Sequence, residues 1–244
     1  MNYKEIFEEI VKRLEAKVPF SLIRLGDGEY MASSGERREY VMKRQLGHVP
    51  SQEDQEFIGE LVKDAYTECD IIGIPTKFHI EQCGSYWARA YEYLQKVRPV
   101  VELIHTCSID VHSEMLKDGL LDKLLQDRNE LIYISGRNLD EQFRKHFNIK
   151  EVKSFILNAE QKFEKRKSQN HWPHQFKMVE EWIDKTDVKG KLCLCGAGIL
   201  GKYYAHLLKR NGGIVIDVGH IFDMWHGLVT RGKGRGNEND KYKL

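Results

Sequence analysis

Short apolar segments alternate with longer amphipathic segments along almost the whole chain, and this alternation constrains the fold more than any other feature. Short apolar runs are typical of buried strands, whereas apolar residues repeating every three or four positions are typical of helices. The alternation predicts an α/β layered fold with a mostly parallel sheet flanked by helices. Strands are expected at 20–25, 70–75, 100–104, 131–134, 152–157, 191–195 and 213–218, and helices at 3–16, 57–65, 85–97, 111–126, 139–147, 174–183 and 199–209.

The chain has 244 residues, with neither an internal repeat nor a long linker. We therefore expect a single domain over residues 1–230, followed by a flexible basic and polar tail over 231–244. A second basic stretch, 164–170, is expected to be an exposed loop. The formal net charge of +1 gives no reason to expect nucleic acid or an anionic membrane as a partner.

The cysteines and the apolar runs bear on the cellular location. Five cysteines are scattered along the chain without a CxxC pair, and no secretory leader is recognisable. This pattern favours a reduced, cytoplasmic protein without structural zinc. No apolar run approaches the roughly 20 residues that a transmembrane helix needs.

Two carboxylates separated by one glycine, Asp27-Gly28-Glu29, directly follow the first predicted strand. In an extended chain, residues i and i+2 point to the same side, so Asp27 and Glu29 are expected to converge on one point. Gly28 keeps side-chain bulk away from that point and permits a tight backbone path. Two hard oxygen ligands suit Mn²⁺ or Mg²⁺, which is useful where a diphosphate is held or expelled. The alternative is a turn that carries two solvated acids.

Arg24 lies inside the same predicted strand, three residues before Asp27. Arginine is rarely buried without a partner. The side chain is therefore expected either to pair with a buried carboxylate or to reach a bound phosphate.

A glycine-rich segment, Gly196-Ala-Gly198-Ile-Leu-Gly201, joins a predicted strand to a predicted helix. The next predicted strand ends in an acid, Asp217, which completes the pattern of a dinucleotide site. Backbone N–H groups at the start of the helix would then bind phosphate. Only 27 residues follow Asp217, which is few for a domain built in the usual order. The alternative is that these glycines only allow the strand and the helix to pack closely.

Two further polar segments follow predicted strands, at the edge where parallel sheets bind ligands. After the strand at 131–134, the side chains of Ser135, Arg137 and Asn138 and the backbone at Gly136 are candidates for binding a nucleotide. The alternative is ordinary turn and helix-cap chemistry.

The second polar segment follows the last predicted strand and carries Asp217, His220 and Asp223. These three residues are our candidates for a catalytic base. Trp225, shortly after them, is expected either to stack on a sugar or to lie in the core.

Three segments together resemble the GT-D-type glycosyltransferases, a bacterial family first catalogued as a domain of unknown function. They are 20–30 with its Asp-x-Glu motif, 195–205 with the glycine-rich turn, and 216–223. The resemblance implies a Rossmann-like fold, a divalent metal at Asp27 and Glu29, a UDP-sugar donor and a glycan or glycoprotein acceptor. It assigns no catalytic base to a position in this chain.

We therefore expect a metal-dependent glycosyltransferase whose donor contacts Arg24, Gly28, Ser135, Gly136, Arg137, Asn138, Gly196 and Gly198. Two alternatives remain open. One is an NAD(P)-binding oxidoreductase that uses the glycine-rich turn at 196–201, and the other is a non-catalytic protein that binds a sugar nucleotide.

Overall fold

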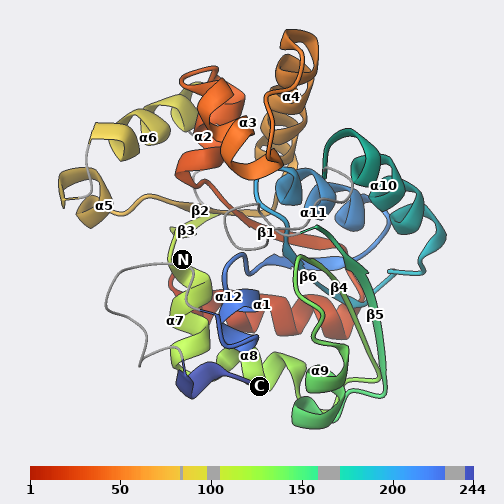
Figure 1. Cartoon of the computed structure of the whole chain (residues 1–244). Coiled ribbons are helices and arrows are strands. Elements are labelled where there is room, and N and C mark those ends of the chain that lie inside the picture. Colours follow the sequence, from red (N-terminus) through yellow and green to blue (C-terminus); the bar gives the residue numbers. More distant parts are fainter. Residues whose placement is uncertain (83–84, 98–104, 159–170, 229–239) are drawn as a thin grey trace.

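Seven parallel strands form one sheet at the centre of the molecule (Figure 1). The structure is a computed structural model that describes residues 1–82, 85–97, 105–158, 171–228 and 240–244. The sheet order is β3-β2-β1-β7-β6-β4-β5, and every pairing among the described strands is parallel. The predicted α/β fold with a parallel sheet is therefore confirmed. The strands are β1 (Phe20–Arg24), β2 (Ile71–Ile74), β3 (Thr106–Ser108), β4 (Glu130–Ser135), β5 (Glu151–Ile156), β6 (Leu192–Gly196) and β7 (Ile214–Asp217).

Helices cover both faces of the sheet, as Figure 1 shows. One face carries α1 (Tyr3–Ala16), α7 (Val111–Lys117), α8 (Leu120–Leu125), α9 (Asp140–Phe147) and α12 (Ile221–Trp225). The other face carries α2 (Asp27–Ser34), α3 (Arg38–Leu46), α4 (Gln52–Glu68), α6 (Ser85–Val97), α10 (Phe176–Lys185) and α11 (Leu200–Arg210). The short helix α5 (Lys77–Gln82) has no buried residue.

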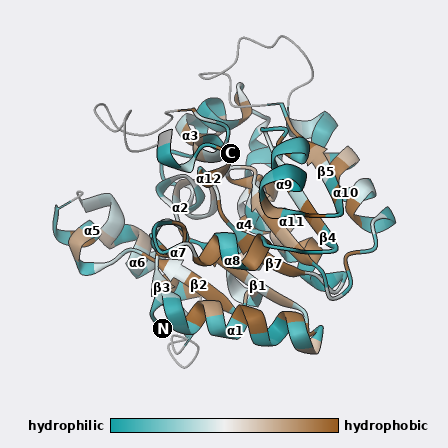
Figure 2. Ribbon diagram, turned by 90° about the horizontal axis from the view of Figure 1, so that it is seen from below, coloured by the Kyte–Doolittle hydropathy of each residue, from teal (hydrophilic) through white to brown (hydrophobic). Residues whose placement is uncertain are grey.

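Side-chain alternation along the strands builds two separate cores from one sheet. In β6, Cys193 and Cys195 face the core that includes α4 and α11, whereas Leu192 and Leu194 face the core that includes α1 and α9. Figure 2 shows the hydrophobic residues gathered on the central strands, with hydrophilic residues on the outer sides of the helices. Because both faces are buried, the strands read in the sequence as continuous apolar runs.

Two predicted elements differ from those in the structure. The helix expected over 111–126 is divided into α7 and α8, because Gly119 between them adopts a left-handed conformation with φ of 67°. The helix expected over 57–65 is longer, since Ser51 caps α4 and accepts a hydrogen bond from the amide of Asp54. The strand expected at 100–104 and the loop at 164–170 lie outside the described residues.

The end of the tail contacts the body of the molecule. The amide of Leu244 donates a hydrogen bond to the carbonyl of Trp225 at 3.0 Å, and Tyr242 and Leu244 pack against one core. A short 3-10 helix, η3 (Asp240–Tyr242), precedes this contact. The part of the expected flexible tail at 231–239 lies outside the described residues. Within the described ranges, no helix combines the length and the apolar character that a membrane span requires.

Trp225 lies in the core rather than in a position to stack on a sugar. Its side chain is 1% exposed, and its ring contacts those of Phe143 and Phe222 at centroid distances of 5.3 and 5.7 Å. The ring therefore fixes α12 against α9, which sets where the chain runs after β7.

We predict that Trp225→Ala lowers the free energy of unfolding by about 3–5 kcal/mol, because it leaves a large cavity in a packed aromatic cluster. Urea unfolding measures this change. Phe78→Ala is the control, since Phe78 is 64% exposed and its loss is expected to stay within about 0.5 kcal/mol. Similar small losses for both variants would contradict the core assignment.

Candidate functional site

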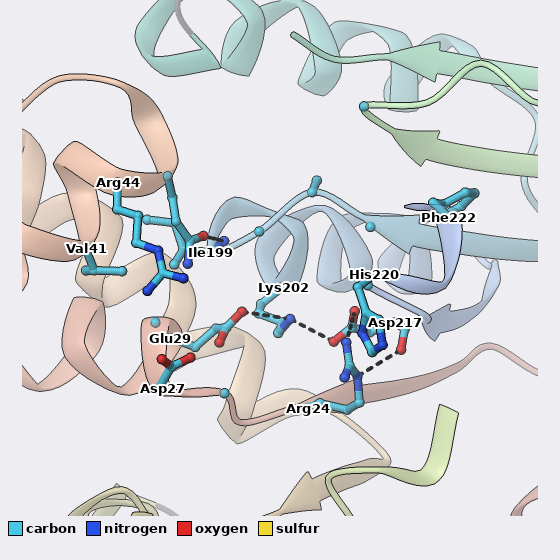
Figure 3. A pocket seen from close by; sticks show the side chains of 18 of the residues that line it. Arg24, Asp27, Glu29, Val41, Arg44, Ile199, Lys202, Asp217, His220 and Phe222 are labelled. Carbon is cyan, nitrogen blue, oxygen red and sulfur yellow. Dashed lines mark hydrogen bonds and ion pairs between the residues drawn. The ribbon is translucent and has the colours of Figure 1, made fainter. Parts of the chain in front are cut away.

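A cavity of about 520 Å³ lies where the carboxyl ends of the strands meet (Figure 3). The chain leaves β6 towards α11 on one face of the sheet and leaves β4 towards α9 on the other, so the loops separate above these neighbouring strands. A parallel sheet binds ligands in the crevice that such a divergence opens. Residues that follow each of the seven strands line the cavity, together with the ends of β1, β4, β6 and β7 and residues of α3.

Asp27, Gly28 and Glu29 form the first turn of α2 instead of continuing the strand. Our expectation that the two carboxylates share one side of an extended chain was therefore wrong. The chain turns into a helix at Gly26, where a Cβ atom would collide with the carboxylate of Glu29. Asp27 and Glu29 still line the same cavity, since α2 begins at the edge of the sheet where β1 ends. Negative charge in a first helical turn also interacts favourably with the helix dipole.

A chain of buried ion pairs connects the motif to the middle of the sheet. Lys202, in the first turn of α11, contacts the carboxylate of Glu29 at 3.0 Å and that of Asp217 at 2.7 Å. Arg24 contacts Asp217 from β1 at 3.2 Å. The side chains of Lys202 and Asp217 are only 5% and 4% exposed. Of the two roles considered for Arg24, the structure shows the pairing with a buried carboxylate.

The charges of this chain of ion pairs stabilise one another. Burial alone would raise the pKa of Asp217, but the cations of Arg24 and Lys202 hold it at about 2. Burial alone would lower the pKa of Lys202, but Asp217 and Glu29 raise it above its usual value. Asp217 and Lys202 are consequently both charged at neutral pH. Asp217 is thus the centre of a fixed electrostatic network.

Two histidines lie beside this network. The guanidinium of Arg24 approaches the ring of His112 at 2.9 Å, and His112 Nε2 lies 3.2 Å from His220 Nδ1. A guanidinium group can only donate hydrogen bonds, so the ring nitrogen of His112 that accepts from Arg24 carries no proton. Both histidines line the cavity. Sequence reasoning proposed His220 but not His112.

The glycine-rich turn lines the cavity and is tightly packed as well. A Cβ atom at Gly196 would meet the ring of Phe222 and the carbonyl of Gly219, and Gly198 has a φ of 59° beside the Gln45 side chain. Gln45 of α3 accepts a hydrogen bond from the amide of Ile199 at 2.7 Å. The side chain of Gln45 therefore satisfies an N–H group that a dinucleotide phosphate would use. Likewise, Asp217 is paired with two cations, whereas a dinucleotide site needs this acid for a ribose.

The segment after β4 contributes three of its four predicted residues. Ser135, Gly136 and Arg137 line the cavity, and Arg137 forms an ion pair with Asp223 at 2.8 Å. Asn138 does not line it: this residue is exposed, and its side chain accepts a hydrogen bond from the amide of Asp140. Asn138 is not the helix N-cap either, because Leu139 occupies that position; its side chain makes only the local turn contact with Asp140.

Several residues that shape the cavity were absent from the sequence prediction. Lys202 could have been predicted from the sequence, because a lysine on the buried side of an amphipathic helix requires an acidic partner. Arg44 and Gln45 could not have been, since α3 was not predicted at all. His79 lies in α5, which was not predicted either. Trp87 lies in the predicted helix at 85–97, but nothing in the sequence marked it as a cavity residue.

No group of three or more His, Cys, Asp or Glu side chains that could hold a metal ion occurs in the described part of the chain. Any metal at Asp27 and Glu29 would therefore need further ligands from water or from a bound phosphate.

Comparison with known proteins adds a family and a fold. The family model of the GT-D fold-like domain matches residues 1–225. No curated protein sequence matches the chain. Three solved structures have a similar fold over all of this chain.

The first is described as a new glycosyltransferase, a domain of unknown function 1792, from Streptococcus sanguinis; it has 13% identity, 92% of its chain covered and a TM-score of 0.61. The second is described as the domain of unknown function 1792 with a distinct glycosyltransferase fold, and it has 15% identity, 89% coverage and a TM-score of 0.58. The third is a selenomethionine form of the same kind of domain, with 14% identity, 89% coverage and a TM-score of 0.60.

We predict that Asp217→Asn destabilises the protein strongly at neutral pH and much less in acid. The pKa of Asp217 is about 2 in the folded protein and near 3.9 when unfolded. Its ion pairs therefore stabilise the fold fully above about pH 5, by roughly 2–3 kcal/mol, and this contribution is lost as the pH falls towards 2.

Urea unfolding of both proteins at about pH 7, 5 and 3 measures this difference. Asp110→Asn serves as the control, because the Asp110 side chain is 53% exposed and pairs only with His79. A stability difference for Asp217→Asn that does not change with pH would contradict the assigned ion pairs.

Proposed function

This chain belongs to the GT-D-like family and is a glycosyltransferase, and we propose that it transfers a sugar from a UDP-sugar to a glycan or glycoprotein acceptor with the help of Mn²⁺ or Mg²⁺. One observation carries this proposal. Asp27 lines the cavity beside Glu29, yet its carboxylate has neither an ion pair nor a hydrogen bond with any described residue. Asp27 therefore carries a negative charge that no described side chain pairs with and that a cation would neutralise.

The residues present fit a metal that is bound together with a nucleotide. Magnesium is typically held by one or two carboxylates, with water and substrate phosphates as the remaining ligands. Asp27 offers both of its oxygens, and Glu29 uses Oε1 for Lys202 while Oε2 lies over Gly26. When bound, such an ion would neutralise charge on the diphosphate as it leaves the sugar.

The buried cations of the site support this role for a metal. Arg24 and Lys202 are both paired with carboxylates, so neither has spare charge for a diphosphate. Within this cluster, the carboxylates of Asp27, Glu29 and Asp217 outnumber the two cations by one. Phosphate oxygens placed beside these three carboxylates would be repelled by them, and a divalent cation between the two would reduce this repulsion.

The donor is proposed to lie over the ends of β1, β6 and β4. Arg24 lines the same region and is fixed there by Asp217. Gly28, Gly196 and Gly198 also line the cavity and would contact the donor through their backbone, because the space that a Cβ atom would need is filled by Gln45 and Phe222. The nucleoside would extend towards Ser135, Gly136 and Arg137. Asn138 is no longer part of this donor site, because its side chain lies outside the cavity.

Among the three candidate bases, we favour His220. Asp217 is a poor base because its pKa is about 2 and it is enclosed by two cations. Asp223 is held by the guanidinium of Arg137 at 2.8 Å. His220 lines the cavity and contacts His112, which fixes the orientation of its ring. If the sugar carbon inverts, a neutral imidazole at this position would remove the proton from the acceptor hydroxyl.

The two alternatives have less support. An NAD(P)-binding oxidoreductase needs free N–H groups at the glycine-rich turn and a free acid at Asp217, but the amide of Ile199 is bonded to Gln45 and Asp217 is paired with cations. A thermal-shift comparison of UDP-sugar plus Mn²⁺ with NAD(H) separates these functions, since stabilisation by NAD(H) alone would exclude our proposal. Hydrolysis of a UDP-sugar without acceptor, and its loss in Asp27→Ala, would exclude a non-catalytic binding protein.

We predict that Asp27→Asn weakens Mn²⁺-dependent binding of UDP by about tenfold or more, equivalent to at least about 1.4 kcal/mol. The neutral amide is a poorer ligand for a hard cation, and the fold should stay intact because Asp27 pairs with no described residue. Calorimetric titration with and without Mn²⁺ measures the change. Asp110→Asn is the matched control, being another carboxylate on the cavity wall. Equal Mn²⁺-dependent affinity in Asp27→Asn and the wild type would show that the metal is not bound here.

We also predict that His220→Gln lowers the rate of sugar transfer by about 100-fold or more while leaving UDP affinity within about twofold of the wild type. Glutamine preserves a polar side chain but cannot accept a proton. Steady-state transfer rates and UDP titration test the two halves of this prediction. An unchanged rate would return the choice to Asp223.

A further inference from the structure

The charged side chains around the cavity are almost all paired with one another. The pairs are Arg24 with Asp217, Lys202 with Glu29 and Asp217, Arg137 with Asp223, and His79 with Asp110, at 2.7 to 3.4 Å. Among the described residues that line the cavity, two charged side chains remain with neither an ion pair nor a hydrogen bond: Asp27 and Arg44. One of them is an acid and the other a base.

Arg44 extends into the cavity from the last turn of α3. In Figure 3 its guanidinium group points towards the side of the cavity that holds Asp27 and Glu29. The neighbouring side chain, Gln45, anchors this turn of α3 through its hydrogen bond with the amide of Ile199. The helix that carries Arg44 is therefore attached directly to the glycine-rich turn, and Gln45 also lies against Gly28 of α2.

The two unpaired charges indicate what kind of ligand the space accepts. An acid and a base that line one cavity without pairing leave room for a group that carries both signs of charge. A diphosphate with a bound divalent cation has this property, because the cation can face Asp27 while the phosphate oxygens face Arg44. The planar guanidinium group suits phosphate in particular, since its N–H groups can donate to two oxygens at once.

We propose that Arg44 binds the diphosphate of the donor next to Asp27, and so determines that the site takes a nucleoside diphosphate sugar. This inference rests on the proposed function for the presence of a donor, but it concerns the diphosphate and not the nucleoside. Arg44 thereby supplies the positive charge that Arg24 and Lys202 cannot offer. No sequence pattern marks this residue.

Binding of UDP and of inorganic pyrophosphate, each with Mg²⁺, to the full chain tests the inference by calorimetry. Arg44→Met is expected to weaken the binding of both probes by about tenfold or more. Arg44→Lys should recover only part of the affinity, because an ammonium group lacks the planar pair of donors. Lys43→Met is the matched control: Lys43 occupies the same last turn of α3 but does not line the cavity, so its loss should leave both affinities unchanged.

The outcomes separate the inference from the proposed function. Wild-type affinity in Arg44→Met, or an equal loss in Lys43→Met, would overturn the role of Arg44. If pyrophosphate binds through Arg44 but UDP binds no tighter than pyrophosphate, the role of Arg44 stands and the UDP-sugar donor fails. If the wild type binds neither probe, both are overturned. Thermal unfolding of each variant establishes that the comparison is made between folded proteins.

Discussion

The buried carboxylate of Asp217 is the interaction on which the rest of the site depends. It lies at the end of β7, in the middle of the sheet, and it holds a cation from each side: Arg24 from β1 and Lys202 from α11. Lys202 in turn holds Glu29 at the start of α2. Burying these charges is unfavourable unless each is paired, so the pairs fix the relative positions of the elements that carry them. The cavity wall is therefore rigid where the acidic motif lies.

This network also explains how the site keeps charge available for a ligand. Because the inner cations and acids neutralise one another, the cavity is not simply an acidic or a basic pocket. It presents one free acid on α2 and one free base on α3, while the paired charges beneath them form a fixed background. A preorganised arrangement of this kind stabilises a charged leaving group without having to rearrange when the bond breaks.

The sequence predicted the fold better than it predicted the site, for physical reasons. Apolar runs such as that of β6 are local patterns, so the strands of the parallel sheet were predicted from periodicity. The glycine-rich turn was predicted from the spacing of its glycines, which is also local. The pairing of Lys202 with Glu29 joins residues far apart in the chain, and no local pattern records it. The start of α2 was predicted as extended chain because Asp27 and Glu29 directly follow the apolar run of β1, whereas the helix begins at Asp27. Arg44 was missed because α3 has a weak apolar pattern. Its proposed role also depends on the lack of an ion-pair partner among the described residues, which no sequence pattern records.

The position of β7 has a consequence for how the protein is made. This strand is the last of the sheet in the chain, yet it lies between β1 and β6 and joins the two halves of the sheet. In a nascent chain that still lacks residues 214–217, no strand connects β1 with β6, so the two halves of the sheet are not joined. Arg24 and Lys202 also lack Asp217 as their ion-pair partner. Such long-range parallel pairing also forms slowly. The cavity therefore cannot assemble before residues 214–217 have been synthesised, and a chain shortened before β7 would lack the site.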